Sequence, residues 1–550
     1  MTSKNFIIIG NYLSGENLAR CFVSYFLLRK LILMAITSDP KKAPKRVTSP
    51  AQSDQVFNHR LKSGEQTLKK QFYGLYENQG RVEDHFADLL KVLRQGYSKR
   101  SDNLKKSDIK REKDKYWFLA EKWVGMMLYS DLFAGDLNGV RKKLDYLEEL
   151  GINLVHLMPL LKSPKKNNDG GYAVSDYRDI NPELGTLDDF KALIKDLHDR
   201  DMIVMIDFVL NHTADEHEWA MKARQGNKEY QDRYYFHQDR TVVNLFEQSL
   251  PEVFPTTAPG NYTYIEELNK WVMTVFNTYQ WDLNYTNPKV FIEMVDVMIF
   301  LSNLGIDILR LDALAFMWKK MGTDSQNLDE AHLVIKAMKS CIRIVAPGTL
   351  FLAEAIVAPY EIVKYFGEGD ELTDECEMAY NATFMVTLWD AMATKNNRLI
   401  LTTLSQIPPK PFGTTWLNYV RCHDDIGLGY EDTHAQWSGY DPTSHRRFLT
   451  EFLSGSHEYS FSKGQKFMEN EKTGDARICG SLASLAGLEK AVDEKDAEQI
   501  EFACRRIKML HSLILSYGGI PMLYSGDELG TLNDYSYLKD SAKADDSRWM

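Results

Sequence analysis

The stretch Gly305–Ala313 reads GIDILRLDA and places three charged groups among branched apolar residues. Residues two apart in a strand point to the same face, so Arg310 and Asp312 share a face that Asp307 does not. A neighbouring guanidinium favours the ionised form of a carboxyl group. An ionised aspartate at the carboxyl end of a buried strand is suited to act as a nucleophile. Taken alone, the stretch fits a structural Arg–Asp pair equally well.

Three further apolar runs end in acidic or imidazole groups. They are VMIDFVLNH (204–212), LFLAEA (350–355) and VRCHDD (420–425). Strand-like and helical patterns alternate along the chain, which predicts an α/β protein with a (β/α)8 TIM barrel and its polar strand ends on one rim. The eight expected strands are Val124–Tyr129, Leu154–Met158, Ile203–Val209, Ile306–Leu311, Leu350–Ala353, Met378–Tyr380, Trp416–Val420 and Ile520–Tyr524.

Length and composition narrow the function classes. A chain of 550 residues exceeds one compact core and predicts two to four domains. A formal net charge of -11 argues against nucleic acid as a partner. The six cysteines are scattered without metal-ligand spacing, which favours a cytoplasmic protein with reduced thiols and no bound metal. They are Cys21, Cys341, Cys376, Cys422, Cys479 and Cys504.

The chain divides into segments of different pattern. In residues 1–54 an apolar run is interrupted by Arg29 and Lys30, so a membrane span is not expected. A signal peptide, an anchor or an extension ahead of Met34 remain alternatives, followed by a linker. Residues 55–118 predict an N-terminal helical domain. The barrel would then occupy 119–212, 290–424 and 482–550, and the connections 213–289 and 425–481 are long enough to be substrate-binding insertions.

Five motifs resemble the amylosucrases of glycoside hydrolase family 13, in the α-amylase superfamily. They are DGGYAVS (169–175), FNTYQWDLNY (276–285), CHDDIG (422–427), GDELGTLND (526–534) and DDSRW (545–549). The likeness runs from about residue 60 to the last residue and includes the helical segment and the second insertion. Sucrose hydrolases are close relatives of this family.

The resemblance implies an enzyme that cleaves sucrose, releases fructose and transfers the glucosyl unit to an α-1,4-glucan. The mechanism would be retaining double displacement, with Asp312 as the nucleophile, Glu354 as the general acid/base and Asp424 as the third carboxylate. Such an enzyme needs no organic cofactor. Its two reacting carboxyl groups should lie roughly 5–5.5 Å apart. Glu354 should have few cationic neighbours, whereas Arg310 should keep Asp312 ionised.

The resemblance also implies a set of substrate-binding residues. An ion pair between Asp169 and Arg548 would close the donor pocket behind a single glucosyl ring. Tyr172 would stack under that ring, and Asp207 would brace the site. The remaining expected residues are His212, Phe276, Gln280, Arg310 and His423 on the donor side, and Ile356, Asp425, Arg446 and Arg477 on the acceptor side.

The chain departs from the family pattern at three places. Pro251 replaces a basic residue, and the segment Tyr440–Arg446 is a few residues longer. The family continues past DDSRW with a last barrel helix and a β-sandwich, so this chain, which stops at Met550, is expected to be an aggregation-prone fragment. A sucrose hydrolase and a non-catalytic family member remain alternatives, and either a monomer or a homodimer is compatible with the sequence.

Overall fold

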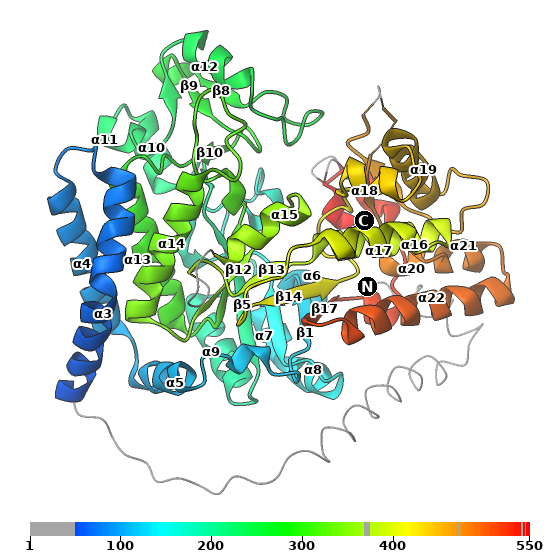
Figure 1. The fold of residues 1–550 in the computed structure, drawn as a ribbon, viewed down its shortest axis with the longest axis horizontal. Coiled ribbons are helices and arrows are strands. Elements are labelled where there is room, and N and C mark those ends of the chain that lie inside the picture. The colour runs from blue at the N-terminus through cyan, green and yellow to red at the C-terminus, as the bar shows by residue number, and fades with distance from the viewer. Residues whose placement is uncertain (1–49, 368–373, 471–472, 475, 541–542, 545) are drawn as a thin grey trace, which may run out of the picture.

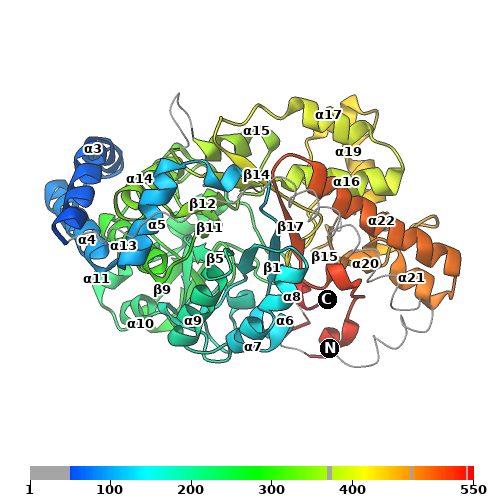
Figure 2. The same ribbon diagram turned by 90° about the horizontal axis from the view of Figure 1, so that it is seen from below.

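A closed barrel of eight parallel strands forms the centre of the computed structural model (Figures 1 and 2). The structure describes residues 50–550 except 368–373, 471–472, 475, 541–542 and 545, so the expected extension lies mostly outside it. All eight predicted strands are confirmed, with ends that differ by no more than two residues. In barrel order they are β1 (Gly125–Leu128), β17 (Ile520–Tyr524), β14 (Thr415–Tyr419), β13 (Met378–Tyr380), β12 (Leu350–Ala353), β11 (Ile308–Asp312), β5 (Ile203–Val209) and β2 (Leu154–Leu157).

Burial on both faces explains why these strands read as apolar runs. Every residue of β5 and of β11 is buried, because side chains fill the barrel on one side and helices cover the other. The register pairs Arg310 of β11 with Asp207 of β5 and with Leu352 of β12. The charged groups of neighbouring strands therefore lie at the same level, close to the carboxyl ends.

Helices cover the outside of the barrel. α13 begins at Pro288 behind the N-cap Asn287, and it ends at Gly305, whose φ of 108° turns the chain into β11. The other helices of the barrel segments are α6 (Ser130–Ala134), α7 (Leu137–Lys142), α8 (Leu144–Glu149), α9 (Leu187–His198), α14 (Asp329–Val345), α15 (Pro359–Ile362), α16 (Ala382–Thr394), α17 (Arg398–Gln406), α20 (Leu482–Leu485), α21 (Leu488–Asp493) and α22 (Ala497–Ser516).

The N-terminal helices α3 (Pro50–Tyr76), α4 (Val82–Lys99) and α5 (Asp102–Lys113) lie beside α13 and α14 (Figure 1). Phe72 of α3 contacts Phe291 of α13 with 5.8 Å between ring centroids. Arg100 makes a buried ion pair with Asp108 at 2.6 Å and also donates to the carbonyl oxygen of Ser302. Apolar and ionic contacts thus join this predicted helical segment to the barrel. Across the described stretch of chain, no helix combines the length and apolar character that a bilayer span requires.

The two predicted insertions carry their own small elements. Residues 213–289 contain most of the first group, and residues 425–481 contain the second. The domain boundaries drawn from the sequence remain a prediction. The elements are β6 (His212–Ala214), α10 (Glu218–Arg224), α11 (Lys228–Gln231), β7 (Phe236–His237), α12 (Arg240–Glu247), β8 (Tyr262–Ile265), β9 (Lys270–Met273) and β10 (Gln280–Asp282), then α18 (Asp432–Trp437), α19 (Pro442–Ser454), β15 (Gln465–Phe467) and β16 (Arg477–Cys479).

Candidate active site

A cleft of about 1110 Å³ lies at the carboxyl ends of the barrel strands and is walled by both insertions. Of the predicted site residues, only Asp207 and Gln280 lie behind its lining, with exposed fractions of 4% and 0%. The predicted residues that line the cleft are Asp169, Tyr172, His212, Phe276, Arg310, Asp312, Glu354, Ile356, His423, Asp424, Asp425, Arg446, Arg477 and Arg548.

Arg310 is the central cation of the site. Its Nη1 atom donates to Asp207 and, at 2.7 Å, to the Oδ1 atom of Asp312. The Arg310–Asp312 pair therefore forms on the face that strand alternation predicted. Its Nη2 atom also lies 3.9 Å from the Oε1 atom of Glu354. Arg310 is thus a cationic neighbour of Glu354 that the sequence did not predict, because β11 lies between β5 and β12 and its arginine reaches the acidic groups of both.

Burial raises the pKa of Glu354 to about 7, while Arg310 and a backbone hydrogen bond act in the opposite direction. That hydrogen bond comes from the N–H group of Ala313, which donates to Oε2 of Glu354 at 2.8 Å. Ala313 has a φ of 50°, a left-handed conformation that residues other than glycine rarely adopt. The turn after β11 thus directs its amide at the carboxyl group of the next strand.

Asp312 and Glu354 are buried carboxyl groups that interact electrostatically. Burial raises the pKa of Asp312 well above its usual value, and the charge of Glu354 adds to this effect. Arg310 acts in the opposite direction but does not offset the burial, so the pKa is raised and not lowered, contrary to the expectation from the sequence. Interacting carboxyl groups lose their protons in steps that belong to the pair. We assign the first negative charge to Asp312, because it accepts a direct hydrogen bond from Arg310 at 2.7 Å and Glu354 does not.

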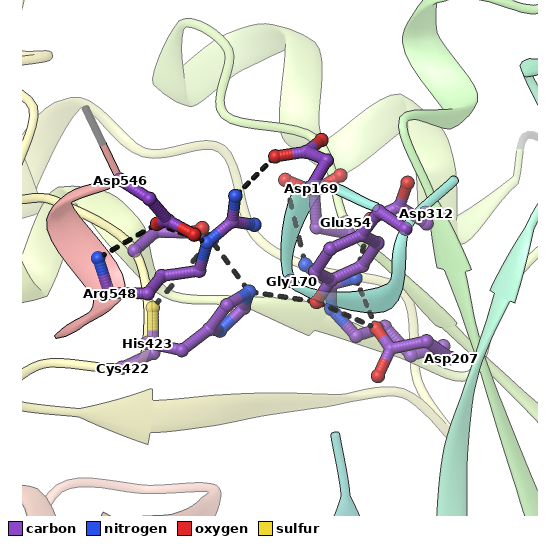
Figure 3. A network of polar contacts seen from close by, with 12 residues as sticks. Asp169, Gly170, Asp207, Asp312, Glu354, Cys422, His423, Asp546 and Arg548 are labelled. Carbon is purple, nitrogen blue, oxygen red and sulfur yellow. Dashed lines mark hydrogen bonds and ion pairs between the residues drawn. The ribbon is translucent and has the colours of Figure 1, made fainter. Parts of the chain in front are cut away.

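An ion pair between Arg548 and Asp169 lies in the lining of the cleft (Figure 3). Gln280 donates to Oδ2 of Asp169 at 2.9 Å, and Arg548 also donates to Asp546 at 2.8 Å. The chain makes a left-handed turn at Asp169 and Gly170, with φ angles of 51° and 63°. A Cβ atom on Gly170 would lie 2.9 Å from Cζ of Arg548, so only glycine leaves space for this ion pair.

Two neutral histidines flank the cleft. Burial lowers the pKa of His212 and of His423 to about 4, so both rings are uncharged near pH 7. The Tyr172 hydroxyl lies 2.7 Å from Nε2 of His423 and donates to Oδ1 of Asp207 at 3.3 Å. The Nε2 atom of His423 also lies 3.2 Å from Oδ1 of Asp424. These contacts hold the polar groups in place around the Tyr172 side chain, on which a sugar ring is expected to stack.

A buried lysine that sequence reasoning missed supports His212 from behind. The Nζ atom of Lys319 lies 2.8 Å from Oδ2 of Asp282 and donates to Oδ1 of Asn211 at 2.9 Å. The amide nitrogen of Asn211 in turn contacts Nδ1 of His212 at 3.2 Å. Lys319 has 0% side-chain exposure and lies in the sequence FMWKK, which carries no pattern that distinguishes a buried lysine from a solvated one.

The opposite side of the cleft joins the two insertions. Arg477 lies 3.6 Å from Asp425 and donates to the carbonyl oxygen of Val253 in the first insertion at 3.3 Å. Arg446 lines the cleft, and it also donates to the carbonyl oxygen of Tyr430 at 2.7 Å. Ile356 is 59% exposed there. All four predicted acceptor-side residues therefore line the cleft.

The cleft also contains residues that the sequence did not single out. They come from separate segments of the chain that converge only in the fold. A single sequence offers no periodic signal for them, although Asp546 lies within the quoted DDSRW motif. They include Lys165, Lys166, Glu252, Phe254, Phe467, Lys543, Asp546 and Trp549.

The (β/α)8 barrel and the acidic residues at its rim define the class of TIM-barrel proteins with a carboxylate-lined cleft. Residues 83–436 match the family model of the α-amylase catalytic domain, and the chain belongs to this family.

The chain is similar to curated members of that family. A trehalose synthase/amylase of Mycolicibacterium smegmatis is 32% identical over 409 residues, which cover 74% of this chain and 61% of that protein. A glucosylglycerate phosphorylase of Escherichia coli is 28% identical over 382 residues, which cover 70% and 63%. The chain thus spans about three fifths of the length of these relatives.

Solved structures share the fold. A sucrose 6F-phosphate phosphorylase from Thermoanaerobacter thermosaccharolyticum aligns with a TM-score of 0.58 and 19% identity, covering 78% of this chain and 81% of that one. The trehalulose synthase of Pseudomonas mesoacidophila aligns with a TM-score of 0.54 and 20% identity, covering 78% and 68%. At these identities the likeness establishes the fold alone.

Proposed function

We propose that the chain is a retaining glucosyltransferase that cleaves sucrose, releases fructose and transfers the glucosyl unit to an α-1,4-glucan. The observation that carries the proposal is the ion pair between Arg548 and Asp169 beside Tyr172 in the lining of the cleft. The Arg548 guanidinium, paired with Asp169, lies 5.8 Å from the centre of the Tyr172 ring. We expect this pair to close the cleft behind a single ring on Tyr172, which favours a disaccharide donor over a long glucan.

In the proposed reaction, the Asp312 carboxylate attacks the anomeric carbon while Glu354 donates its proton to the departing glycosidic oxygen. Fructose leaves, and the glucosyl unit remains bound to Asp312 through an ester. Glu354 then accepts a proton from the acceptor hydroxyl, which attacks the same carbon and restores its configuration. The pKa of about 7 for Glu354 supports this exchange of roles. We retain the predicted separation of roughly 5–5.5 Å between the two carboxyl groups.

The other polar groups would hold the glucosyl ring. Asp424 presents a carboxylate that is 45% exposed to the cleft, next to the neutral ring of His423. Hydrogen bonds from such groups to the sugar hydroxyls can strengthen as the ring flattens toward an oxocarbenium ion. Asp207 would act indirectly, because it is buried behind the lining and braces Arg310 and Tyr172.

Water is the alternative acceptor, which would make the protein a sucrose hydrolase with the same catalytic residues. A non-catalytic family member would have no need of all three carboxylates. The similarity to the trehalose synthase/amylase of Mycolicibacterium smegmatis favours a further candidate, an isomerase that forms trehalose and keeps both sugars in the cleft. These functions share the chemistry at the donor sugar and differ in which acceptor receives the glucosyl unit.

Product analysis separates these functions. The chain is incubated with sucrose and, separately, with maltose, and fructose, glucose, trehalose and insoluble glucan are measured. The proposal expects fructose in excess of free glucose, together with glucan. Equal amounts of glucose and fructose would favour the hydrolase. Trehalose from maltose, with sucrose unchanged, would refute the proposal and support the isomerase.

A further inference from the structure

Three consecutive residues after β14, Cys422, His423 and Asp424, bring three kinds of metal ligand together. One potential ligand atom from each lies within 4.8 Å of the others. The Nε2 atom of His423 is 3.2 Å from Oδ1 of Asp424, and Sγ of Cys422 is 4.0 Å from Oδ2 of the same carboxylate (Figure 3). The proposed glucosyl transfer uses His423 and Asp424 but assigns nothing to the thiol.

The spacing of these atoms suits a tetrahedral zinc ion. Zinc binds sulfur at about 2.3 Å and nitrogen or oxygen at about 2.0–2.2 Å, which places neighbouring ligands roughly 3.3–3.7 Å apart. The observed separations are 3.2 Å to Oδ1 and 4.0 Å to Oδ2 of Asp424, and one ligand atom from each of the three residues lies within 4.8 Å of the others, somewhat wider than that range. Small rotations of the Cys422 and Asp424 side chains would therefore bring the three atoms around one ion. Thiolate, imidazole and carboxylate are all zinc ligands.

An ion can approach these groups through a side cavity. This cavity of about 240 Å³ is lined by Cys422 and Asp424, and it shares Asp424, Asp425 and Ile356 with the catalytic cleft. The Nδ1 atom of His423 has no hydrogen-bond partner among the described residues, so it can keep the ring proton while Nε2 binds. The histidine is thus available as a neutral ligand.

The nearby cations do not prevent binding, because each is already paired. Arg310 contacts Asp207 and Asp312, and Arg548 contacts Asp169 and Asp546. The carboxylate of Asp424, in contrast, has the thiol of Cys422 and the ring of His423 beside it. A divalent cation would compensate the negative charge of the Asp424 carboxylate, which faces the cleft.

We propose that Cys422, His423 and Asp424 form an inhibitory site for a thiophilic divalent cation such as Zn²⁺. The thiol releases its proton to solvent as the sulfur–zinc bond forms, and a water molecule completes the tetrahedron. The bound ion takes His423 away from Tyr172 and occupies the Asp424 carboxylate, so it competes with the glucosyl donor. This competition rests on the proposed function, whereas binding of the metal does not.

The test compares the parent chain with Cys422→Ser. Titration with Co²⁺, which replaces zinc and absorbs light, is expected to give a thiolate-to-cobalt charge-transfer band in the parent and none in the variant. The Zn²⁺ concentration that halves fructose release from sucrose should rise at least tenfold in Cys422→Ser, with unchanged activity when no metal is present. The control is Cys504→Ser, which removes a buried thiol of α22 and should behave like the parent.

Two results would overturn the proposal: absence of the charge-transfer band in the parent, or equal zinc inhibition of the parent and Cys422→Ser. The cobalt titration uses no sugar, so its outcome is independent of whether sucrose is the donor. Cys422→Ala is the second variant, and thermal unfolding verifies that both variants are folded. The same loss of the band in both would assign the sulfur ligand to Cys422.

Discussion

Ala313 shows how one backbone group can organise two reacting side chains. It follows Asp312 directly, and its N–H group donates to Glu354 at 2.8 Å. Its φ of 50° is unfavourable for an alanine, and the surrounding barrel holds it there. The proposed nucleophile and the proposed acid are therefore linked through a single peptide group, which supports a fixed distance between them.

Removing either reacting carboxyl group should abolish turnover. Asp312→Asn removes the nucleophile and Glu354→Gln removes the proton donor, so fructose release from sucrose should fall by about a hundredfold or more in each. The matched control is Glu361→Gln, because Glu361 lies in nearby α15 and pairs with Lys364. Release that stays at the parental rate in both catalytic variants would show that these assignments are wrong.

The raised pKa of Glu354 predicts a pH dependence. Only the protonated form can donate to the leaving oxygen, so kcat/KM for sucrose should decline as pH rises through about 7. Glucosyl fluoride needs little protonation of its leaving group and should show a weaker decline. A profile for sucrose that stays level up to pH 9 would contradict the role of Glu354 as acid.

The left-handed turn at Gly170 gives a prediction for the loop that closes the donor end. Gly170→Ala would bring a Cβ atom to 2.9 Å from Arg548 and should raise KM for sucrose more than it lowers kcat. Gly226→Ala is the matched control, since Gly226 has a φ of 85° but open space around it. Both variants carry the cost of a left-handed alanine, about 1–2 kcal/mol, and only Gly170→Ala disturbs the ion pair.

A second prediction at this level concerns the buried network of Lys319, Asp282, Asn211 and His212. Lys319→Met leaves Asp282 without its cation and should cost about 3–5 kcal/mol of stability. It should also raise KM for sucrose, because Asn211 and His212 lose their support. Lys339→Met is the control, since it removes the buried partner of Glu377 outside the cleft lining. Its stability should fall with KM unchanged; a parental KM in Lys319→Met would refute the positioning role.

The strands of this fold were predictable because the barrel strands are short, largely apolar runs that alternate with helical patterns, and several of them end in a polar group. These patterns are local, and they identified all eight strands. The contacts of Lys319 with Asn211 and Asp282 join positions about a hundred and about forty residues away in the chain, and no local pattern encodes them. The contact of Arg310 with Glu354 was missed for a similar reason, because it depends on strand order.

The two insertions meet above the acceptor side of the cleft through Arg477. Its contacts with Asp425 and with the Val253 carbonyl connect β16 to the first insertion. Arg477→Ala should open this wall, admit more water and shift products from glucan toward free glucose several-fold. Arg447→Ala is the control, because Arg447 donates to the Thr473 carbonyl within the second insertion. An unchanged ratio of glucan to glucose would show that Arg477 does not govern the acceptor.

Resemblance gave the donor side of the cleft more fully than the acceptor side. The donor groups come from strand ends and from short motifs such as DGGYAVS, whose positions the barrel fixes. The residues predicted for the acceptor side come mostly from the insertion 425–481, and Pro251, a departure from the family pattern, also lines the cleft. Loop conformation depends on contacts between distant segments. A sequence therefore predicts which residues a loop contributes better than it predicts the shape of the loop.

Under the proposed function, the ion pair between Arg548 and Asp169 gives the cleft a single opening. If sugars enter and leave by the same opening, the released fructose must depart before the acceptor glucan can bind in its place. Steady-state plots for donor and acceptor should then be parallel, as in ping-pong kinetics. Under the proposed function, the same closed end would restrict transfer to the chain ends of a polysaccharide, because an internal segment could not pass through the cleft.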